Sequence, residues 1–124
     1  MNNKNYFFDT YAIIEIIKGN ENYNHLCDWN IITSLMNLAE VYYALLLIYN
    51  KETVDNLLKN FNFEFLEINP QIAKESAIFR HKNKNLKMSY IDCVGYILAL
   101  NNGLLFLTGD KAFERFENVE FIKA

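Results

Sequence analysis

The sequence predicts an α/β domain, a three-layer sandwich in which a mostly parallel sheet of about five strands lies between two layers of helices. Short apolar segments typical of buried strands alternate along the chain with segments of helical periodicity. Residues that begin or end helices stand between them. The 124 residues are 52% hydrophobic and include one Pro and four Gly, which indicates a single compact domain over residues 1–124.

The first half of the chain predicts two strands and three helices. Residues 6–8 form a short apolar strand that turns directly into a helix, with Thr10 as its N-cap and Gly19 as its stop. Residues 30–33 form a second strand, and Ser34 caps a helix that runs to about residue 50. A further helix follows from about residue 51 to residue 61. The stretch 35–49 is apolar, so we expect a buried helix there.

The second half repeats this alternation. Residues 63–66 read as a strand, and Asn69-Pro70 opens a helix with Pro in its first turn. Ser89 opens another helix that ends near Asn102-Gly103. Strands at 104–107 and 119–122 flank a short helix that Asp110 begins. Functional groups of such sheets collect at the carboxyl ends of the strands, and Asp9 and Asp110 fall there.

Charge and cysteine content restrict the function and location. The net charge of −3 repels nucleic acid as a whole, so any RNA contact needs a local basic patch. Cys27 and Cys93 are expected to be reduced, as in a cytoplasmic protein. His25 and Cys27 have no second ligand pair, so zinc is not indicated. The start of the chain lacks the apolar core of a signal peptide, and 35–49 is shorter than the roughly 20 apolar residues that span a bilayer, so we expect no membrane segment.

Four acids stand in apolar surroundings and are the candidate catalytic residues: Asp9, Glu40, Asp92 and Asp110. The aspartates have an alternative role, because Asp9 and Asp110 can cap helices and Ser89-x-x-Asp92 matches a capping box. Glu40 lies inside a helix, where its alternative is a salt bridge to a distant base. Carboxylates brought together indicate a Mg²⁺ or Mn²⁺ site. A metal-bound water is a nucleophile suited to phosphodiester cleavage.

Four short motifs around these acids occur in the order of a known family. They are Phe7-Phe8-Asp9-Thr10, Asn37-Leu38-Ala39-Glu40, Met88-Ser89-Tyr90-Ile91-Asp92 and Thr108-Gly109-Asp110-Lys111-Ala112-Phe113. Over nearly its whole length the chain resembles PIN-domain ribonucleases, especially the VapC-type toxins of toxin–antitoxin pairs.

The resemblance implies a PIN-like fold and a metal site for Mg²⁺ or Mn²⁺ made by Asp9, Glu40, Asp92 and Asp110. It also implies that the hydroxyls of Thr10 and Thr108 orient a carboxylate or a water, although capping and turn hydrogen bonds are the alternative for both. Some members of the family carry a further acid where this chain has Ala112, so we expect a single ion.

One basic cluster is available for RNA, formed by Arg80, His81, Lys82, Lys84 and Lys87. It leads directly into Ser89 and Asp92, and we expect Arg80, Lys82, Lys84 and Lys87 to hold the phosphate backbone. The alternative is a solvated helix end, where cations interact favourably with the helix dipole.

The apolar run 42–47 gives its helix more apolar surface than one sheet face covers. We therefore expect this helix, with the preceding one, to bind a second copy of the chain or a helix of a cognate antitoxin.

The predicted function is that of a metal-dependent endoribonuclease, the toxin of a toxin–antitoxin pair. An RNA-processing nuclease outside such a pair and a non-catalytic PIN-like module that binds RNA or protein are the alternatives. A phosphoacceptor signalling domain of similar architecture is disfavoured, because such a domain needs an acidic pair after the first strand. Here the two residues before Asp9 are Phe7 and Phe8, and neither is acidic.

Overall fold

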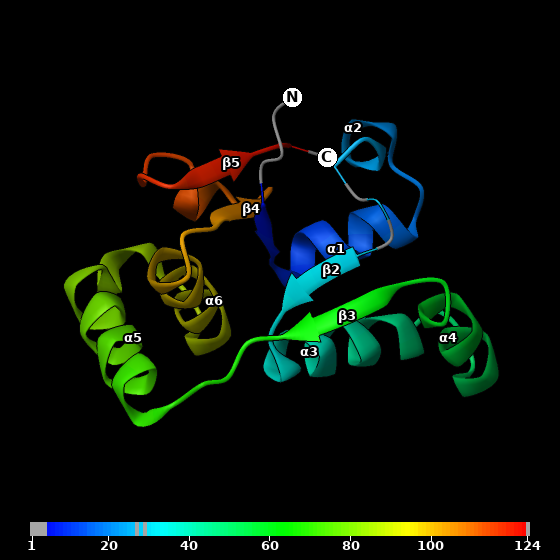
Figure 1. Ribbon diagram of the computed structural model, residues 1–124, viewed down its shortest axis with the longest axis horizontal. Coiled ribbons are helices and arrows are strands. Elements are labelled where there is room, and N and C mark those ends of the chain that lie inside the picture. Colours follow the sequence, from blue (N-terminus) through cyan, green and yellow to red (C-terminus); the bar gives the residue numbers. More distant parts are fainter. Residues whose placement is uncertain (1–4, 27, 29, 124) are drawn as a thin grey trace.

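The computed structural model describes residues 5–26, 28 and 30–123, and its centre is a five-stranded parallel sheet (Figure 1). The strand order is β3-β2-β1-β4-β5. The strands are β1 (Tyr6–Phe8), β2 (Asn30–Thr33), β3 (Asn62–Phe65), β4 (Leu105–Thr108) and β5 (Val119–Phe121). Phe7 of β1 pairs with Ile32 on one side and with Phe106 on the other. The predicted α/β class with a parallel sheet is confirmed.

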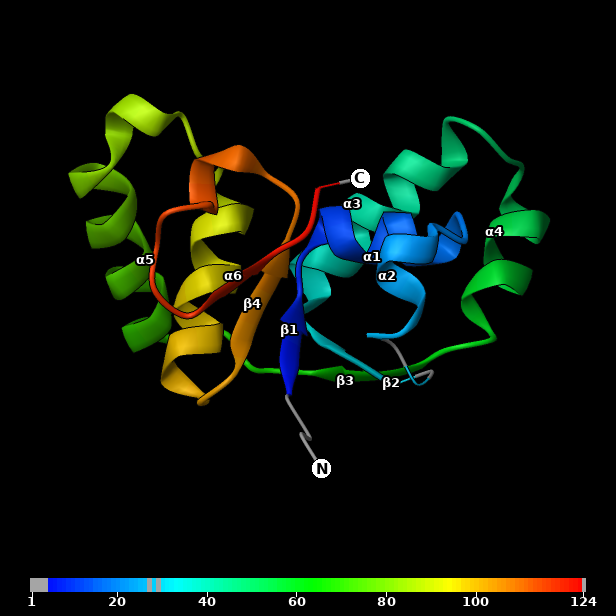
Figure 2. The same cartoon turned by 90° about the horizontal axis from the view of Figure 1, so that it is seen from above.

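Helices cover both faces of this sheet (Figure 2). One layer holds α1 to α4 and the other holds α5 and α6. The helices are α1 (Thr10–Ile17), α2 (Glu21–Asn24), α3 (Leu35–Leu46), α4 (Lys51–Leu58), α5 (Pro70–Lys82) and α6 (Tyr90–Asn101), with 3₁₀ turns η1 (Lys84–Leu86) and η2 (Lys111–Phe113). The three-layer architecture predicted from the sequence is therefore present.

Each face of the sheet has its own hydrophobic core, because alternate strand residues point to opposite sides. Tyr6 and Phe8 pack with α1, α3 and α4, whereas Phe7 packs with α5 and α6. On the α6 side the helix lies directly on the sheet: a Cβ added at Gly95 would stand 2.9 Å from Cε1 of Phe7. Cys93 is a free, buried thiol in this core, and Cys27 lies outside the described residues.

The predicted element boundaries need small corrections. The N-cap of α1 is Asp9 and not Thr10, since the Asp9 side chain accepts the Ala12 amide and Thr10 is the first helical residue. The short helix α2 was not predicted, because four residues carry too little periodicity to identify it. The helix after Ser34 ends at Leu46 rather than near residue 50, and α4 ends at Leu58 rather than at residue 61.

The expected burial of α3 holds for one face of the helix only. Its buried residues are Asn37, Val41 and Leu45, which lie on one face. Tyr43 is 66% exposed and Leu47, which caps the helix, is 71% exposed. The helix packs on one side only of the sheet and against α1 and α4, so its outer face remains apolar and uncovered by the described chain. Within the described residues, no helix has the length and apolar character needed to cross a membrane.

A candidate carboxylate site at the carboxyl edge of the sheet

The central strands end together at one edge of the sheet. Asp9 follows β1, Ser34 follows β2 and Thr108 is the last residue of β4. The chain places β2 on one side of β1 and β4 on the other, and parallel α/β sheets bind ligands at such a reversal of strand order. The topology therefore directs the polar residues after β1, β2 and β4 to one region.

Asp9 is the most buried of the four acids, with 3% of its surface exposed. Its Oδ1 accepts the Ala12 amide at 2.8 Å, and its Oδ2 accepts the Thr108 hydroxyl at 2.5 Å. Burial raises the pKa of Asp9 to about 7 in spite of these two hydrogen bonds, and the charges of Asp92 and Asp110 add to the rise. Asp9 thus lies in a region where negative charge is unfavourable without a compensating cation.

Thr108 joins Asp9 to Asp110. While its hydroxyl donates to Asp9, the same oxygen accepts the backbone amide of Asp110 at 3.0 Å. Asp110 in turn caps η2, since its Oδ1 accepts the Ala112 amide at 3.0 Å. The turn between them is tight, because a Cβ at Gly109 would stand 2.7 Å from the Ile122 carbonyl oxygen.

Asp92 forms the capping box that the sequence indicates. The Ser89 hydroxyl accepts the Asp92 amide at 3.1 Å, and Asp92 Oδ2 accepts the Ser89 amide at 3.2 Å. Burial raises the pKa of Asp92, and the charge of Asp110 raises it further. All three aspartates therefore take part in helix capping, Asp9 and Asp110 as N-caps and Asp92 as the third helical residue of a capping box. For Asp92 and Asp110 the cap uses only one carboxylate oxygen, so capping and ligand binding are compatible.

Glu40 is half-buried and is connected to the edge of the sheet through Thr10. The Thr10 hydroxyl donates to Glu40 Oε1 at 2.6 Å and accepts Nδ2 of Asn37 at 3.2 Å. Sequence reasoning did not identify Asn37 as part of the site. Its signal was the spacing Ser34-x-x-Asn37-x-x-Glu40, which places three polar residues on one helix face.

The donor set of the four acids fits a hard divalent cation. As the side chains stand, no three His, Cys, Asp or Glu residues of the described chain are gathered closely enough to enclose a metal ion. No described Lys, Arg or His forms an ion pair with any of the four acids. Within the described residues, the alternative of a salt bridge for Glu40 is therefore not found. Carboxylates without a basic partner are the ligands that Mg²⁺ and Mn²⁺ take, and the charges of Asp92 and Asp110 raise the pKa of Asp9 further.

The basic cluster lies next to Asp92 in sequence and is held against the start of α6. The Arg80 Nε donates to the Met88 carbonyl at 2.9 Å, and its guanidinium carbon lies 4.4 Å from the centre of the Tyr90 ring. Lys82, Lys84 and Lys87 are exposed, whereas Arg80 is half-buried. Arg80 and Lys82 also belong to the last turn of α5, so they interact favourably with its dipole as well.

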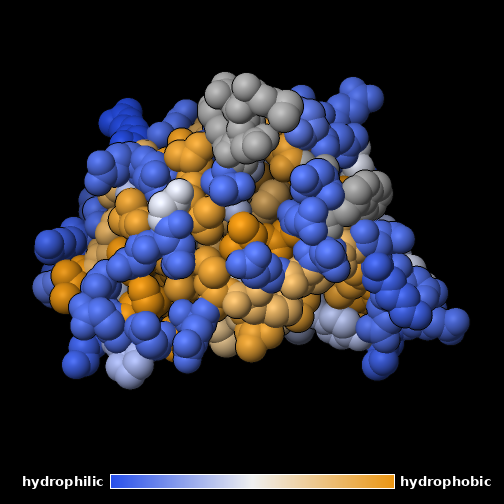
Figure 3. Space-filling model, viewed as in Figure 1, coloured by the Kyte–Doolittle hydropathy of each residue, from blue (hydrophilic) through white to orange (hydrophobic). Residues whose placement is uncertain are grey.

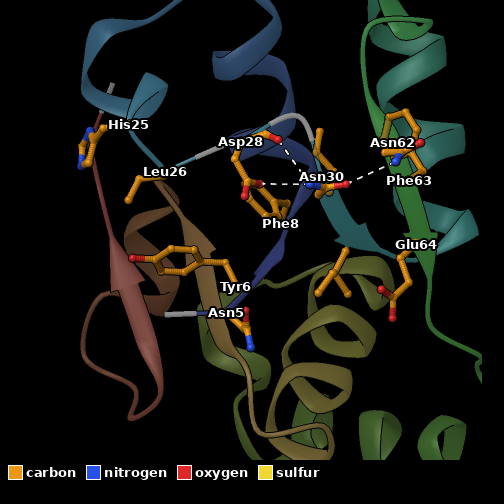
Figure 4. A pocket seen from close by; sticks show the side chains of 12 residues that line it. Asn5, Tyr6, Phe8, His25, Leu26, Asp28, Asn30, Asn62, Phe63 and Glu64 are labelled. Carbon is orange, nitrogen blue, oxygen red and sulfur yellow. Dashed lines mark hydrogen bonds between the residues drawn. The ribbon is translucent and has the colours of Figure 1, made fainter. Parts of the chain in front are cut away.

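A cavity of about 980 Å³ lies at the opposite edge of the sheet, near the amino ends of β1, β2 and β3. Figure 4 shows Asn30 between Asp28 and Asn62 on its wall, with His25 nearby. None of the four acids lines this cavity. It is therefore separate from the carboxylate site.

Comparisons with known proteins bear on the family and the fold. The pattern of the PIN domain family matches residues 6–119. None of the curated protein sequences compared matches the chain significantly.

Among solved structures, a toxin–antitoxin complex from Klebsiella pneumoniae is similar to the chain with a TM-score of 0.75 at 20% identity, covering 96% of this chain and 99% of that chain. VapBC2 from Rickettsia felis, bound to a DNA fragment from its promoter, has a TM-score of 0.75 at 18% identity, with 95% and 97% covered. VapC20 from Mycobacterium tuberculosis, a sarcin–ricin loop cleaving toxin, has a TM-score of 0.69 at 13% identity, with 92% and 98% covered. At these identities the likeness shows the fold alone. The match of the family pattern over residues 6–119 shows that the chain belongs to the PIN domain family.

Proposed function

We propose that the protein is a metal-dependent endoribonuclease and the toxin of a toxin–antitoxin pair. The observation that carries the proposal is the hydrogen-bonded series from Asp9 through Thr108 to Asp110 at the carboxyl edge of the sheet, with no described basic residue paired to either acid. Membership of the PIN domain family supports the same chemistry.

Asp9, Glu40, Asp92 and Asp110 would hold one Mg²⁺ or Mn²⁺ ion through their carboxylate oxygens. Such an ion, when bound, lowers the pKa of a coordinated water and offsets the charge of the phosphate. Thr108 orients Asp9, and Thr10 orients Glu40, through the hydrogen bonds that their hydroxyls donate. These bonds keep the acceptor oxygens in fixed directions and leave other lone pairs for the cation.

RNA is the substrate that the surroundings of the site favour. Exposed Lys82, Lys84 and Lys87, together with Arg80 beside Tyr90, would bind the phosphate backbone close to Asp92. One structural neighbour is described as a sarcin–ricin loop cleaving toxin, which is consistent with RNA cleavage by this fold.

The outer face of α3 is the proposed binding surface for an antitoxin or for a second copy of the chain. Large apolar side chains exposed there and in the following turn are Leu35, Met36, Tyr43, Leu46, Leu47, Ile48 and Tyr49. Figure 3 shows apolar side chains gathered over the lower centre of the molecule, around β3 and α3. One structural neighbour is a toxin–antitoxin complex, which supports a protein as the partner.

The test is an RNA cleavage assay with purified protein and Mg²⁺ or Mn²⁺, repeated with EDTA. We expect cleavage only with the ion, and at least a hundredfold loss in Asp9→Asn and Asp92→Asn, as expected for removal of groups that act as a unit. Activity in EDTA, or variants as active as the parent, would overturn the mechanism. RNA binding without cleavage would favour the non-catalytic module.

A further inference from the structure

A continuous chain of side-chain hydrogen bonds runs from the end of β2 to Glu40. The Ser34 hydroxyl donates to Asn37 Oδ1 at 2.6 Å, and Asn37 Nδ2 donates to Thr10 Oγ1 at 3.2 Å. The Thr10 hydroxyl then donates to Glu40 Oε1 at 2.6 Å. The chain therefore connects the N-cap of α3, the first residue of α1 and a proposed metal ligand.

The direction of every bond in this chain is determined. Ser34 Oγ accepts the backbone amide of Asn37 at 3.2 Å and donates its single proton to Asn37 Oδ1, which can only accept. The amide of Asn37 is thereby oriented with its NH₂ group toward Thr10. Since Thr10 receives that donor, its own proton is directed at the carboxylate of Glu40, which accepts only.

Burial makes this arrangement rigid. Ser34 is 0% exposed and Asn37 is 1% exposed, so water does not compete for their polar atoms, and an unpaired amide there would be costly. A carboxylate in contact with solvent, as Glu40 is in part, has rotational freedom unless a fixed donor holds it. The only described hydrogen bond to the Glu40 side chain comes from Thr10.

We infer that Asn37 is a positioning residue of the carboxylate site, which acts through Thr10 to hold Glu40 in the orientation that a divalent cation requires. The inference rests on the proposed function, because it takes Glu40 as a ligand. Asn37 has no direct contact with the cation in this account. Without its amide, the Thr10 proton is free to turn away and Glu40 loses its fixed donor.

The test measures Mn²⁺ affinity by calorimetry, which does not depend on RNA cleavage. Asn37→Leu, which removes both polar groups at similar volume, is expected to weaken Mn²⁺ binding by roughly 10- to 100-fold, the range seen when a group that orients a metal ligand is lost. Asn37→Ser keeps a small polar side chain that is too short to join Ser34 to Thr10, and it is expected to weaken Mn²⁺ binding to a similar extent. Thr10→Ser keeps the hydroxyl and should bind like the parent, whereas Thr10→Val should resemble Asn37→Leu.

A double-mutant cycle separates positioning from a general loss of structure. If Asn37 acts through Thr10, then Asn37→Leu causes no further loss of Mn²⁺ affinity in a Thr10→Val background. Ser76→Ala is the matched control, because Ser76 is equally buried and hydrogen-bonded but lies on α5 in the other core. It should lower stability and leave Mn²⁺ affinity unchanged.

Two results would overturn the inference alone. One is Mn²⁺ affinity in Asn37→Leu and Asn37→Ser equal to that of the parent, and the other is a full additional loss when Asn37→Leu is combined with Thr10→Val. If the parent itself binds no Mn²⁺, the proposed metal site is overturned, and this inference falls with it.

Discussion

At the scale of single residues, the site is built from helix caps. Asp9, Asp92 and Asp110 each accept a backbone amide at the start of α1, α6 or η2. Capping fixes where each carboxylate lies, and burial then makes its charge unfavourable. The same residues can thus stabilise the fold by capping while their charges remain unfavourable until a cation is bound.

Asp9 makes the stability of the protein depend on pH. Its pKa is about 7 in the folded chain against an ordinary value of 3.8, so between these values the folded state holds a proton that the unfolded state has lost. Stability from this group is fully present below pH 3.8 and is lost as the pH rises to about 7. At about 1.4 kcal/mol per pKa unit, the free energy of unfolding of the parent without metal should fall by on the order of 3 kcal/mol from pH 5 to pH 8. The Asp9→Asn variant should not show this fall, because it lacks the titrating group.

Urea unfolding in EDTA at both pH values measures this difference. Asp55→Asn serves as the control, because the Lys51 ammonium and the Tyr42 hydroxyl lower the pKa of Asp55 and so place its titration below this window. The same change with pH in the parent and in Asp9→Asn would contradict the account.

At Asp110, capping and charge can be separated by two substitutions. Asn and Asp cap helices about equally well, whereas Ala does not cap them. Asp110→Asn should therefore keep the stability of the parent and lose Mn²⁺ affinity, while Asp110→Ala should lose that affinity and also about 1 kcal/mol of stability. Thermal unfolding measures the stability of each variant, and calorimetry on the same samples measures its Mn²⁺ affinity. Unchanged Mn²⁺ affinity in Asp110→Asn would exclude Asp110 as a ligand.

At the scale of elements, the contact between α6 and the sheet determines where Asp92 lies. The Phe7 and Phe106 rings, stacked at 6.0 Å, meet the helix at Gly95. No larger residue fits there without moving α6 or a core ring. Since Asp92 is one turn away on the same helix, packing at Gly95 and ligand position are coupled.

Gly95→Ala is expected to be destabilising although Ala favours helices. Its Cβ would stand 2.9 Å from Phe7 Cε1 and 3.1 Å from Phe106 Cε1, and overpacking of this kind costs roughly 1–3 kcal/mol. Leu100→Ala, at a partly exposed position of α6, should cost less. A Gly95→Ala variant as stable as the parent in urea would show that α6 does not rest on the two rings.

At the scale of the whole molecule, the exposed apolar face of α3 is the kind of surface that monomeric proteins rarely leave in contact with water. We expect the parent to form dimers at high concentration in light scattering. The double substitution Tyr43→Glu with Leu47→Glu should lower the association constant at least tenfold and leave the circular dichroism unchanged, because both side chains are exposed.

Ile78→Glu is the matched control for this prediction. Ile78 is 54% exposed on α5, away from α3, so its substitution should leave association intact. A monomeric parent at high concentration would contradict the homodimer and leave the antitoxin as the partner of this surface.

Much of this molecule could be predicted from sequence, because its signals are local. Caps at Ser34, Asn69 and Ser89 and the apolar strand segments define the order of elements, and the alternation of strands and helices defines the parallel sheet. The sequence predicts a buried helix at α3 but not which of its faces is buried, because composition does not show which side the sheet covers. The spacing of Asn37 and Glu40 was visible in the sequence, but the hydrogen bond from Asn37 to Thr10 could not be predicted, since it joins α3 to α1 across 27 positions.

The most direct test of the carboxylate site is a Mn²⁺ titration of the purified protein at pH 8, compared with Glu40→Gln. Glu40 is the informative residue because, unlike the three aspartates, it caps no helix. We expect one Mn²⁺ ion bound per chain in the parent and a large loss of affinity in Glu40→Gln, with the fold intact. A parent that binds no Mn²⁺, or a Glu40→Gln variant that binds it as tightly as the parent, would contradict this expectation.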